Sequence, residues 1–287
     1  MEFPQIALYI VSLTSFYIAL SVGFGFTMRS VKFFNFAYGG AFLIGGYTMF
    51  LFYRELLFPF IISLFFSLLA SGLYLLLAYY LVFLPLLRRK AKGLVSLIAS
   101  FGILAATSAV LGIIFGNQTT LIARHLSDIQ TTNIFGLVLN SVQLSGIIVA
   151  TFLVVIIAFI RQKTHFGYIV RAVENDAEVA ELVGISTEKT YAILFFASGI
   201  FAGLAGIADG FDIGIIPATG LIVMLPTIIA AVIGGMGSFW GGVLGAFILA
   251  VVQKTTVVIF GGVWEQAVPF LILIIILWLR PEGILKE

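Results

Sequence analysis

The segment "FPFIISLFFSLLASGLYLLLAYYLVFL", Phe58–Leu84, decides the fold class of this chain. It runs for 27 residues without a charged side chain. A helix of about 20 apolar residues is long enough to cross the roughly 30 Å hydrocarbon layer of a membrane. A strand of a membrane barrel would alternate apolar and polar residues, and this segment does not alternate. It therefore predicts a membrane-spanning helix.

The composition of the whole chain agrees with a membrane location. Hydrophobic residues make up 61% and charged residues 10% of the 287 residues, whereas soluble domains hold about 45–50% apolar and about 25% charged residues. A water-facing surface needs more polar residues than this chain has, which excludes a soluble protein. The net charge of +2 is too small to suggest nucleic acid as a partner. The lack of cysteine excludes disulfides and thiolate metal sites.

Apolar segments like the first recur along the chain, and none has an acidic or basic residue in its middle. We predict an all-α, polytopic membrane protein with eight or nine transmembrane helices in a single domain, residues 1–287. The short, glycine-rich region 213–253 is open to two interpretations, two crossings or a re-entrant hairpin. The predicted spans are 5–27, 36–53, 57–86, 94–116, 141–160, 190–208, 221–236, 238–253 and 266–280.

Lysine and arginine residues cluster after alternate spans, and such short basic loops stay in the cytoplasm. This distribution predicts an outer N-terminus and an inner C-terminus, hence an odd number of crossings, and nine fits. The basic residues that follow the first, third, fifth and last spans are Arg29, Lys32, Arg88, Arg89, Lys90, Lys92, Arg161, Lys163, Arg171, Arg280 and Lys286.

The region 161–189 is the one strongly charged part of the chain and holds nine of its 28 charged residues. Within it, "NDAEVAELVGI" reads as a short helix. Asn175 or Asp176 is a suitable N-cap, and Gly184 is a suitable stop. Ala177, Ala180, Glu181 and Gly184 share one face of little bulk. A solvated loop is the plain alternative, but the start and stop signals favour a cytoplasmic helix that docks into a groove.

Glycines recur at helical spacing in "GIFAGLAGIADG", where Gly199, Gly203, Gly206 and Gly210 lie on one face. Small residues on one face let membrane helices approach closely. We expect these glycines to serve close packing within the chain, and the alternatives are a pore lining or a subunit interface.

Five blocks of the sequence resemble the permeases of branched-chain amino acid ABC importers, and they follow the family's order. The most extensive is "GYIVRAVENDAEVAELVGISTEKTYAILFFASGIFAGLAGI". "FFNFAYGGAFLIGGY" is similar to the family's INFAHGE block, and "TIIAAVIGGMGSFWGGVLGAFIL" to its AAVLGGIGS-PGA block. "RPEGIL" is similar to its terminal P-x-GI/L, and "LVSLIASFGI" to the start of its fourth span.

The resemblance implies a permease domain in the cell (inner) membrane, with no enzymatic activity, cofactor or metal site. It implies that an ATPase subunit contacts a coupling helix at about 174–185 within the cytoplasmic loop 161–189. The chain has no G-x-x-x-x-G-K-[ST], so the P-loop must belong to another polypeptide. A second, similar permease subunit and an extracytoplasmic solute-binding protein are further implied partners. The expected coupling residues are Arg171, Asn175, Asp176, Ala177, Glu178, Ala180, Glu181, Gly184 and Ile185.

The translocation path is expected at two of these blocks, because irregular backbone at membrane depth survives only beside a cavity or inside protein. Spans two to five and six to nine would then form a parallel four-plus-four repeat. Tyr38 stands where the family usually shows His and Gly40 where it often shows Glu, so the solute stays open between branched-chain amino acids and urea or short amides. The expected path residues are Asn35, Phe36, Tyr38, Gly39, Gly234, Gly235, Gly237 and Ser238.

Two other classes of function compete with an importer permease. A secondary transporter usually needs a buried ionisable group, and Asp209 and Asp212, at the outer end of a span, are the candidates. A membrane-embedded enzyme would need clustered His, Asp or Glu. His125 and His165 fall on opposite sides of the membrane in the predicted topology, which argues against an enzyme.

Overall fold

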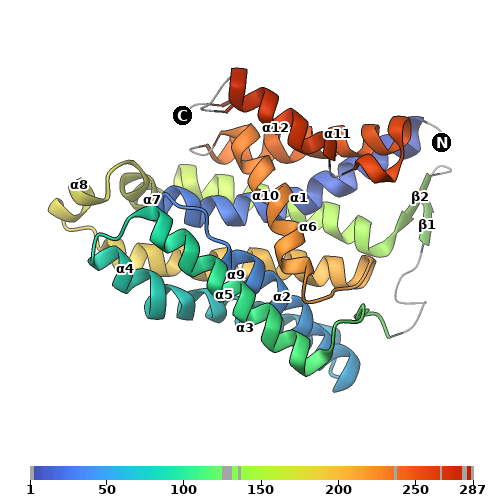
Figure 1. Ribbon diagram of the computed structural model, residues 1–287, viewed down its shortest axis with the longest axis horizontal. Coiled ribbons are helices and arrows are strands. Elements are labelled where there is room, and N and C mark those ends of the chain that lie inside the picture. Colours follow the sequence, from blue (N-terminus) through green and yellow to red (C-terminus); the bar gives the residue numbers. More distant parts are fainter. Residues whose placement is uncertain are drawn as a thin grey trace.

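The computed structural model describes residues 3–124, 131–134, 137–235, 238–265, 267–279 and 283–285. Most of its helices lie lengthwise beside one another (Figure 1). The helices of the first half are α1 (Phe3–Val31), α2 (Ala37–Met49), η1 (Phe50–Glu55), α3 (Phe60–Ala78), η2 (Tyr79–Phe83), α4 (Leu84–Arg88) and α5 (Gly93–Phe115). Those of the second half are α6 (Ser141–Lys163), α7 (His165–Asn175), α8 (Ala177–Leu182), α9 (Thr187–Asp212), α10 (Thr219–Gly234), α11 (Phe239–Phe260), η4 (Gly262–Trp264) and α12 (Ala267–Leu279).

Every predicted span coincides with an apolar helix, but the helices differ in length. Six described helices are long and apolar enough to cross a membrane: α1, the continuous run from α3 to α4, α5, α6, α9 and α11. Helices α10 and α12 are shorter, and α2 has 13 residues. In the region 213–253, α11 has the length expected of a crossing, whereas α10, with 16 residues, is shorter. Several helices extend beyond the predicted spans, because polar residues at their ends continue the helix.

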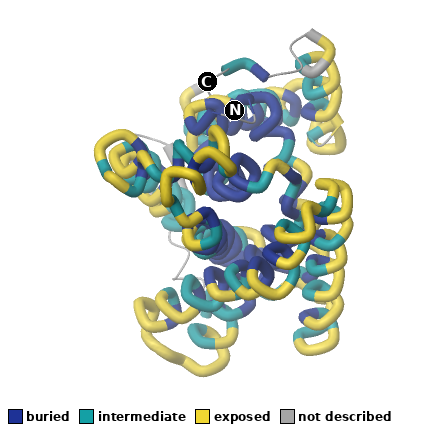
Figure 2. Tube along the Cα trace, turned by 90° about the vertical axis from the view of Figure 1, so that its left-hand side faces the viewer, coloured by how far each residue is buried: buried dark blue, intermediate teal, exposed yellow. Residues whose placement is uncertain are grey.

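Helix α9 lies at the centre of the molecule, packed against α1, α2 and α3. In its most apolar window 61% of the residues are buried, compared with 11% in α6. Figure 2 shows the same division, with buried segments at the centre and exposed segments on the outer helices. The exposed residues of the outer helices are largely apolar, as expected for side chains that face lipid.

The glycine face of α9 makes the closest of these contacts. A methyl group on Gly199 would overlap the Ser71 carbonyl of α3, and one on Gly206 would overlap the Phe42 carbonyl of α2. The Ser71 hydroxyl lies between them, 2.7 Å from the Ala41 carbonyl and 2.6 Å from the Gly199 carbonyl. The expectation that these glycines pack helices together within the chain is confirmed.

The two ends of the bundle differ in character. Helices α4, α7 and α8 gather at one end, beside the basic segments 88–92 and 161–171, and the N-terminus lies at the other (Figure 1). The N-terminal end also carries a two-stranded antiparallel hairpin, β1 (Thr131–Ile134) and β2 (Leu137–Asn140). The all-α fold class holds for the bundle, and this short pair of strands is an addition that the sequence analysis does not predict.

Packing of α9 against α2 predicts a sharp difference between two glycines. We expect Gly206→Ala to destabilise the protein by about 1–3 kcal/mol, because backbone atoms of α2 occupy the space that the new methyl group needs. Gly102→Ala on α5 is the matched control, since no atom lies within 4 Å of that position. The melting temperature of the purified protein in detergent measures both changes. Equal melting temperatures for the two variants would contradict this account of the α2–α9 contact.

Candidate functional sites: an outer cavity and a cytoplasmic helix

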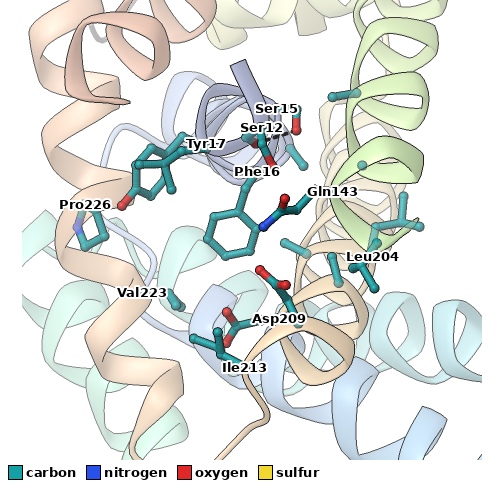
Figure 3. A pocket seen from close by; sticks show the side chains of 18 of the residues that line it. Ser12, Ser15, Phe16, Tyr17, Gln143, Leu204, Asp209, Ile213, Val223 and Pro226 are labelled. Atoms are coloured by element: carbon teal, nitrogen blue, oxygen red, sulfur yellow. Dashed lines mark hydrogen bonds between the residues drawn. The ribbon is translucent and has the colours of Figure 1, made fainter. Parts of the chain in front are cut away.

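A cavity of about 900 Å³ opens between α1, α6, α9 and α10, with further contributions from α3, α11 and α12. Its lining residues lie on the first half of α1, the start of α6 and the last turns of α9. These parts of the helices are remote from the basic loops, so the charge distribution predicts that the cavity opens on the outer side. The surface is mainly apolar, and Phe16, Leu204, Val223 and Pro226 face the open space (Figure 3).

A few polar groups interrupt the apolar lining. The Tyr17 hydroxyl donates a hydrogen bond of 2.6 Å to Oε1 of Gln253. Asp212 Oδ1 accepts a hydrogen bond of 3.1 Å from Nδ2 of Asn140, the N-cap of α6. Asp209 Oδ2 is buried and has no hydrogen-bond partner among the described residues. A small number of polar groups in an apolar pocket is the usual composition of a small-molecule site.

Charged groups at the cavity were only partly anticipated by the sequence. Asp209 and Asp212 were placed beyond the end of the predicted span 190–208, but α9 continues to Asp212 and carries both carboxylates into the cavity. Nζ of Lys254 on α11 lies 3.5 Å from Oε1 of Glu265, and both residues also line the cavity. The contribution of α1 and α6 to the same space could not be read from the sequence.

The first predicted path block does not line this cavity. Asn35 is fully buried, and its Oδ1 accepts a hydrogen bond of 3.1 Å from the backbone N–H of Ala37 at the start of α2. Tyr38 packs edge-on against Phe24. Phe36 is half-buried against Phe101 of α5, and Gly39 abuts the Gly220 carbonyl of α10. These residues pack α2 against its neighbours, and their role in the path stays a prediction.

The second predicted path block forms the turn between α10 and α11. A methyl group on Gly234 would overlap the Gly241 carbonyl, and Gly235 has a φ of +107°. Ser238 caps α11 through the N–H of Gly241 at 3.1 Å. Gly235 and Ser238 border a void of only about 10 Å³. Gly237 lies outside the described residues.

The terminal "RPEGIL" block also contributes to this turn. The N–H groups of Ile284 and Leu285 donate to the carbonyls of Ile233 and Gly234, each at 3.0 Å. Gly283, at φ +85°, fits against the backbone of Gly235. Two blocks that are distant in sequence are therefore joined at the inner end of α10, whereas the first path block is not part of this contact.

The cytoplasmic loop 161–189 consists of α7 and α8 between the ends of α6 and α9. Helix α8 is shorter than the predicted range of 174–185. Asp176 is its N-cap and accepts from the N–H groups of Glu178 and Val179 at 2.9 and 3.1 Å. Gly184, at φ +86°, ends it, with Ile185 N–H donating to the Ala180 carbonyl. The predicted start and stop signals are both confirmed.

The orientation of α8 differs from expectation. Ala180 is 2% exposed, so the small-residue face expected to dock is turned into the chain at this position. Glu181 and Gly184 of the same face are exposed and Ala177 is half-buried, so the docking role of this face stays a prediction. The face turned to water carries Val179, Leu182 and Val183, and Leu182 is 86% exposed.

A buried charge cluster ties this loop to the helix bundle. Glu174 of α7 accepts hydrogen bonds from Arg29 of α1 at 3.1 Å and from Arg161 of α6 at 3.1 and 3.0 Å. All three side chains are largely buried. Arg171 reaches the carbonyl of Arg161. No spacing rule links Arg29 to Glu174, so this cluster could not be predicted from the sequence.

The remaining coupling residues lie around the same two helices. Asn175, Glu178 and Glu181 are exposed, whereas Ala177 and Ile185 are half-buried. The described residues contain no group of three or more metal-ligating side chains. A bundle of apolar helices with an outer cavity and a charged cytoplasmic helix pair defines a transport permease.

Comparison with known proteins identifies the family. The model of the branched-chain amino acid transport system permease component matches residues 6–277, and the chain belongs to this family. It is 26% identical, over 96% of its length and 92% of the relative's, to the high-affinity branched-chain amino acid transport system permease protein LivH of Salmonella typhimurium. It is 31% identical to the xylose transport system permease protein XylH of Haemophilus influenzae, over 46% of this chain and 38% of that one.

One solved structure shares the fold. PsaBC from Streptococcus pneumoniae in complex with Fab contains a chain that superposes with a TM-score of 0.53 and 15% sequence identity, covering 98% of this chain and 93% of that chain. The protein is thus a multi-pass membrane permease of an ABC transport system and not an enzyme.

The Glu174 cluster predicts that one carboxylate matters far more than its neighbours. Glu174→Gln removes the carboxylate that two buried guanidinium groups share, and we expect a loss of about 3–5 kcal/mol of stability. Glu188→Gln is the control, because the Glu188–Arg88 pair is well exposed and should contribute at most about 1 kcal/mol. Thermal unfolding of the detergent-purified variants distinguishes them. A Glu174→Gln variant as stable as wild type would mean that the cluster does not hold the loop in place.

Proposed function

We propose that this chain forms the membrane path for branched-chain amino acids in an ABC importer. The observation that carries the proposal is the outer cavity, which is large enough for such a solute and has apolar walls for an aliphatic side chain. Family membership supports the same class of solute. Urea, short amides and sugars need several hydrogen-bonding groups in their site, and the apolar walls favour them less.

The docking site for the ATPase subunit is proposed on the water-facing side of α8. Val179, Leu182 and Val183 form an apolar patch on a cytoplasmic surface that is otherwise charged, and exposed apolar patches mark contact sites. Glu178 and Glu181 lie at its edge. Through α7 and the Glu174 cluster, movement of this patch would reach α1, which lines the outer cavity.

The inner half of the path is proposed to be closed by the blocks around Asn35–Gly39 and Gly234–Ser238. Both are tightly packed, while the cavity is open on the other side, so the arrangement corresponds to an outward-open state. We further propose that the chain crosses the membrane nine times and contains the four-plus-four repeat. Its proposed partners are a second permease subunit and an extracytoplasmic solute-binding protein at the end of the bundle that carries the β1–β2 hairpin.

Docking at the apolar patch predicts a specific loss of coupling. In Leu182→Asp a charge replaces an exposed apolar side chain, so the protein should fold normally but bind its ATPase subunit more than about tenfold less tightly. Ser186→Asp adds the same charge in the same loop, at the N-cap of α9, and should bind normally. Co-purification with the ATPase subunit measures both. Ala180→Trp should instead damage folding, since Ala180 is buried.

Transport itself is tested with the complete complex in proteoliposomes. We expect uptake of radiolabelled L-leucine that requires ATP and persists after ion gradients are collapsed. Uptake that follows a sodium or proton gradient without ATP would contradict the importer and favour a secondary transporter.

A further inference from the structure

We propose that the outer cavity selects solutes that carry a protonated amine, with Asp209 as the counter-charge for that group. The inference rests on the proposed function, because it treats the cavity as the solute's site. It names a chemical class, primary ammonium compounds with an aliphatic body, and a specificity-determining residue on α9.

The charge inventory of the cavity leads to this class. Among the described lining residues the charged ones are three carboxylates and one ammonium group, and none is an arginine or a histidine. Glu265 is paired with Lys254, and Asp212 accepts a hydrogen bond from Asn140. Asp209 is half-buried and lines the cavity, and its Oδ2 has no hydrogen-bond partner among the described residues. By formal charge the lining therefore has more carboxylates than ammonium groups, and Asp209 is the carboxylate for which neither an ion pair nor a side-chain hydrogen bond is found among the described residues.

An uncompensated carboxylate in apolar surroundings is unfavourable, and an incoming cation relieves that cost. A hydrogen bond between an ammonium group and a carboxylate is roughly twice as strong as one between neutral partners. A neutral solute such as urea, an amide or a sugar brings no charge and leaves Asp209 without a counter-ion. An anion without an amine is repelled by the excess of carboxylates.

The surroundings of Asp209 fit the rest of an amino acid. Asp209, Gln143 and Phe16 face the same open space (Figure 3). Gln143 Oε1 accepts from the N–H of Asn140 at 3.4 Å, which leaves its amide nitrogen as a donor for a solute carboxylate. The Phe16 ring offers a π face to an ammonium group, and Val223 and Leu204 offer apolar contact.

The lack of native cysteine allows a direct binding test on the full-length purified chain. Ser12→Cys places a thiol on the cavity wall, and its rate of reaction with a maleimide reports occupancy. Gln118→Cys, exposed on the outer loop, controls for effects of the solutes on the reagent. The probes are L-leucine, 3-methylbutylamine, 4-methylpentanoate and 4-methylpentanamide, which share one aliphatic body and differ in charge.

We expect L-leucine and 3-methylbutylamine to slow labelling of Ser12→Cys, and the acid and the amide to leave it unchanged. In the Asp209→Asn background, protection by 3-methylbutylamine should need about tenfold more amine or disappear. Equal protection by the amine and the amide would overturn the proposal, and so would unchanged protection in Asp209→Asn. If Asp209→Asn fails to fold, the comparison of the four solutes on Ser12→Cys with Asp209 intact still tests the proposal.

An ammonium group could also come from the headgroup of phosphatidylethanolamine. Nanodiscs of phosphatidylcholine and phosphatidylglycerol, with and without phosphatidylethanolamine, separate the two sources. Slow labelling that requires the ethanolamine lipid, and is unaffected by 3-methylbutylamine, would assign the site to lipid and overturn solute selection. If the amine protects Ser12→Cys but uptake does not require ATP, the proposed importer function is overturned and the amine selectivity stands. If uptake of leucine requires ATP but the amine does not protect, the amine selectivity is overturned and the importer function stands.

Discussion

The close approach of α9 to α2 and α3 is the contact on which the rest of the structure depends. In a membrane, lipid is as apolar as the protein core, so burial of apolar surface does not drive helices together as it does in water. Packing and hydrogen bonds must hold them instead. The glycines of α9 bring backbone against backbone, and the Ser71 hydroxyl adds a hydrogen bond inside the contact. This fixed centre positions α1 and α10, and with them the walls of the cavity.

Charged side chains inside the bundle lie near its two ends, and their partners differ between the ends. At the cytoplasmic end Glu174 is bound by two arginines, which neutralise it and fix α7 to α1 and α6. At the outer end Asp209 lies in a cavity whose one described lysine, Lys254, is paired with Glu265. A carboxylate that is already paired with cations can hold two parts of the structure together. A carboxylate without a cationic partner can bind a cationic solute. The two carboxylates thus have different roles because their partners differ.

The sequence predicts the helices well and their faces poorly. Long uncharged segments, the cap at Asp176 and the stop at Gly184 are local signals, and each appears in the structure. Which side of α6 faces lipid is not a local signal, because lipid and protein interior are both apolar, whereas the glycine spacing of α9 does indicate the face that packs. For the same reason Ala180 could not be assigned to a partner or to the core. The cavity and the Glu174 cluster join residues more than a hundred positions apart, so no spacing along the chain reveals them.

The packing of the inner end constrains how a path could open there. At the turn between α10 and α11 the contacts run from backbone to backbone, through Gly234, Gly241 and Gly245. Side-chain rotations alone cannot open these contacts, because each joins backbone atoms to backbone atoms. The terminal segment is hydrogen-bonded to the end of α10 and would move with it. Opening toward the cytoplasm therefore requires α10, α11 and the terminal segment to move as one body relative to α1, as transporters do when one bundle rocks against another. Arg29 borders the small void beside this turn and also binds Glu174. The Glu174 cluster, which holds the loop 161–189 against α1, therefore lies next to the α10–α11 turn that would have to move.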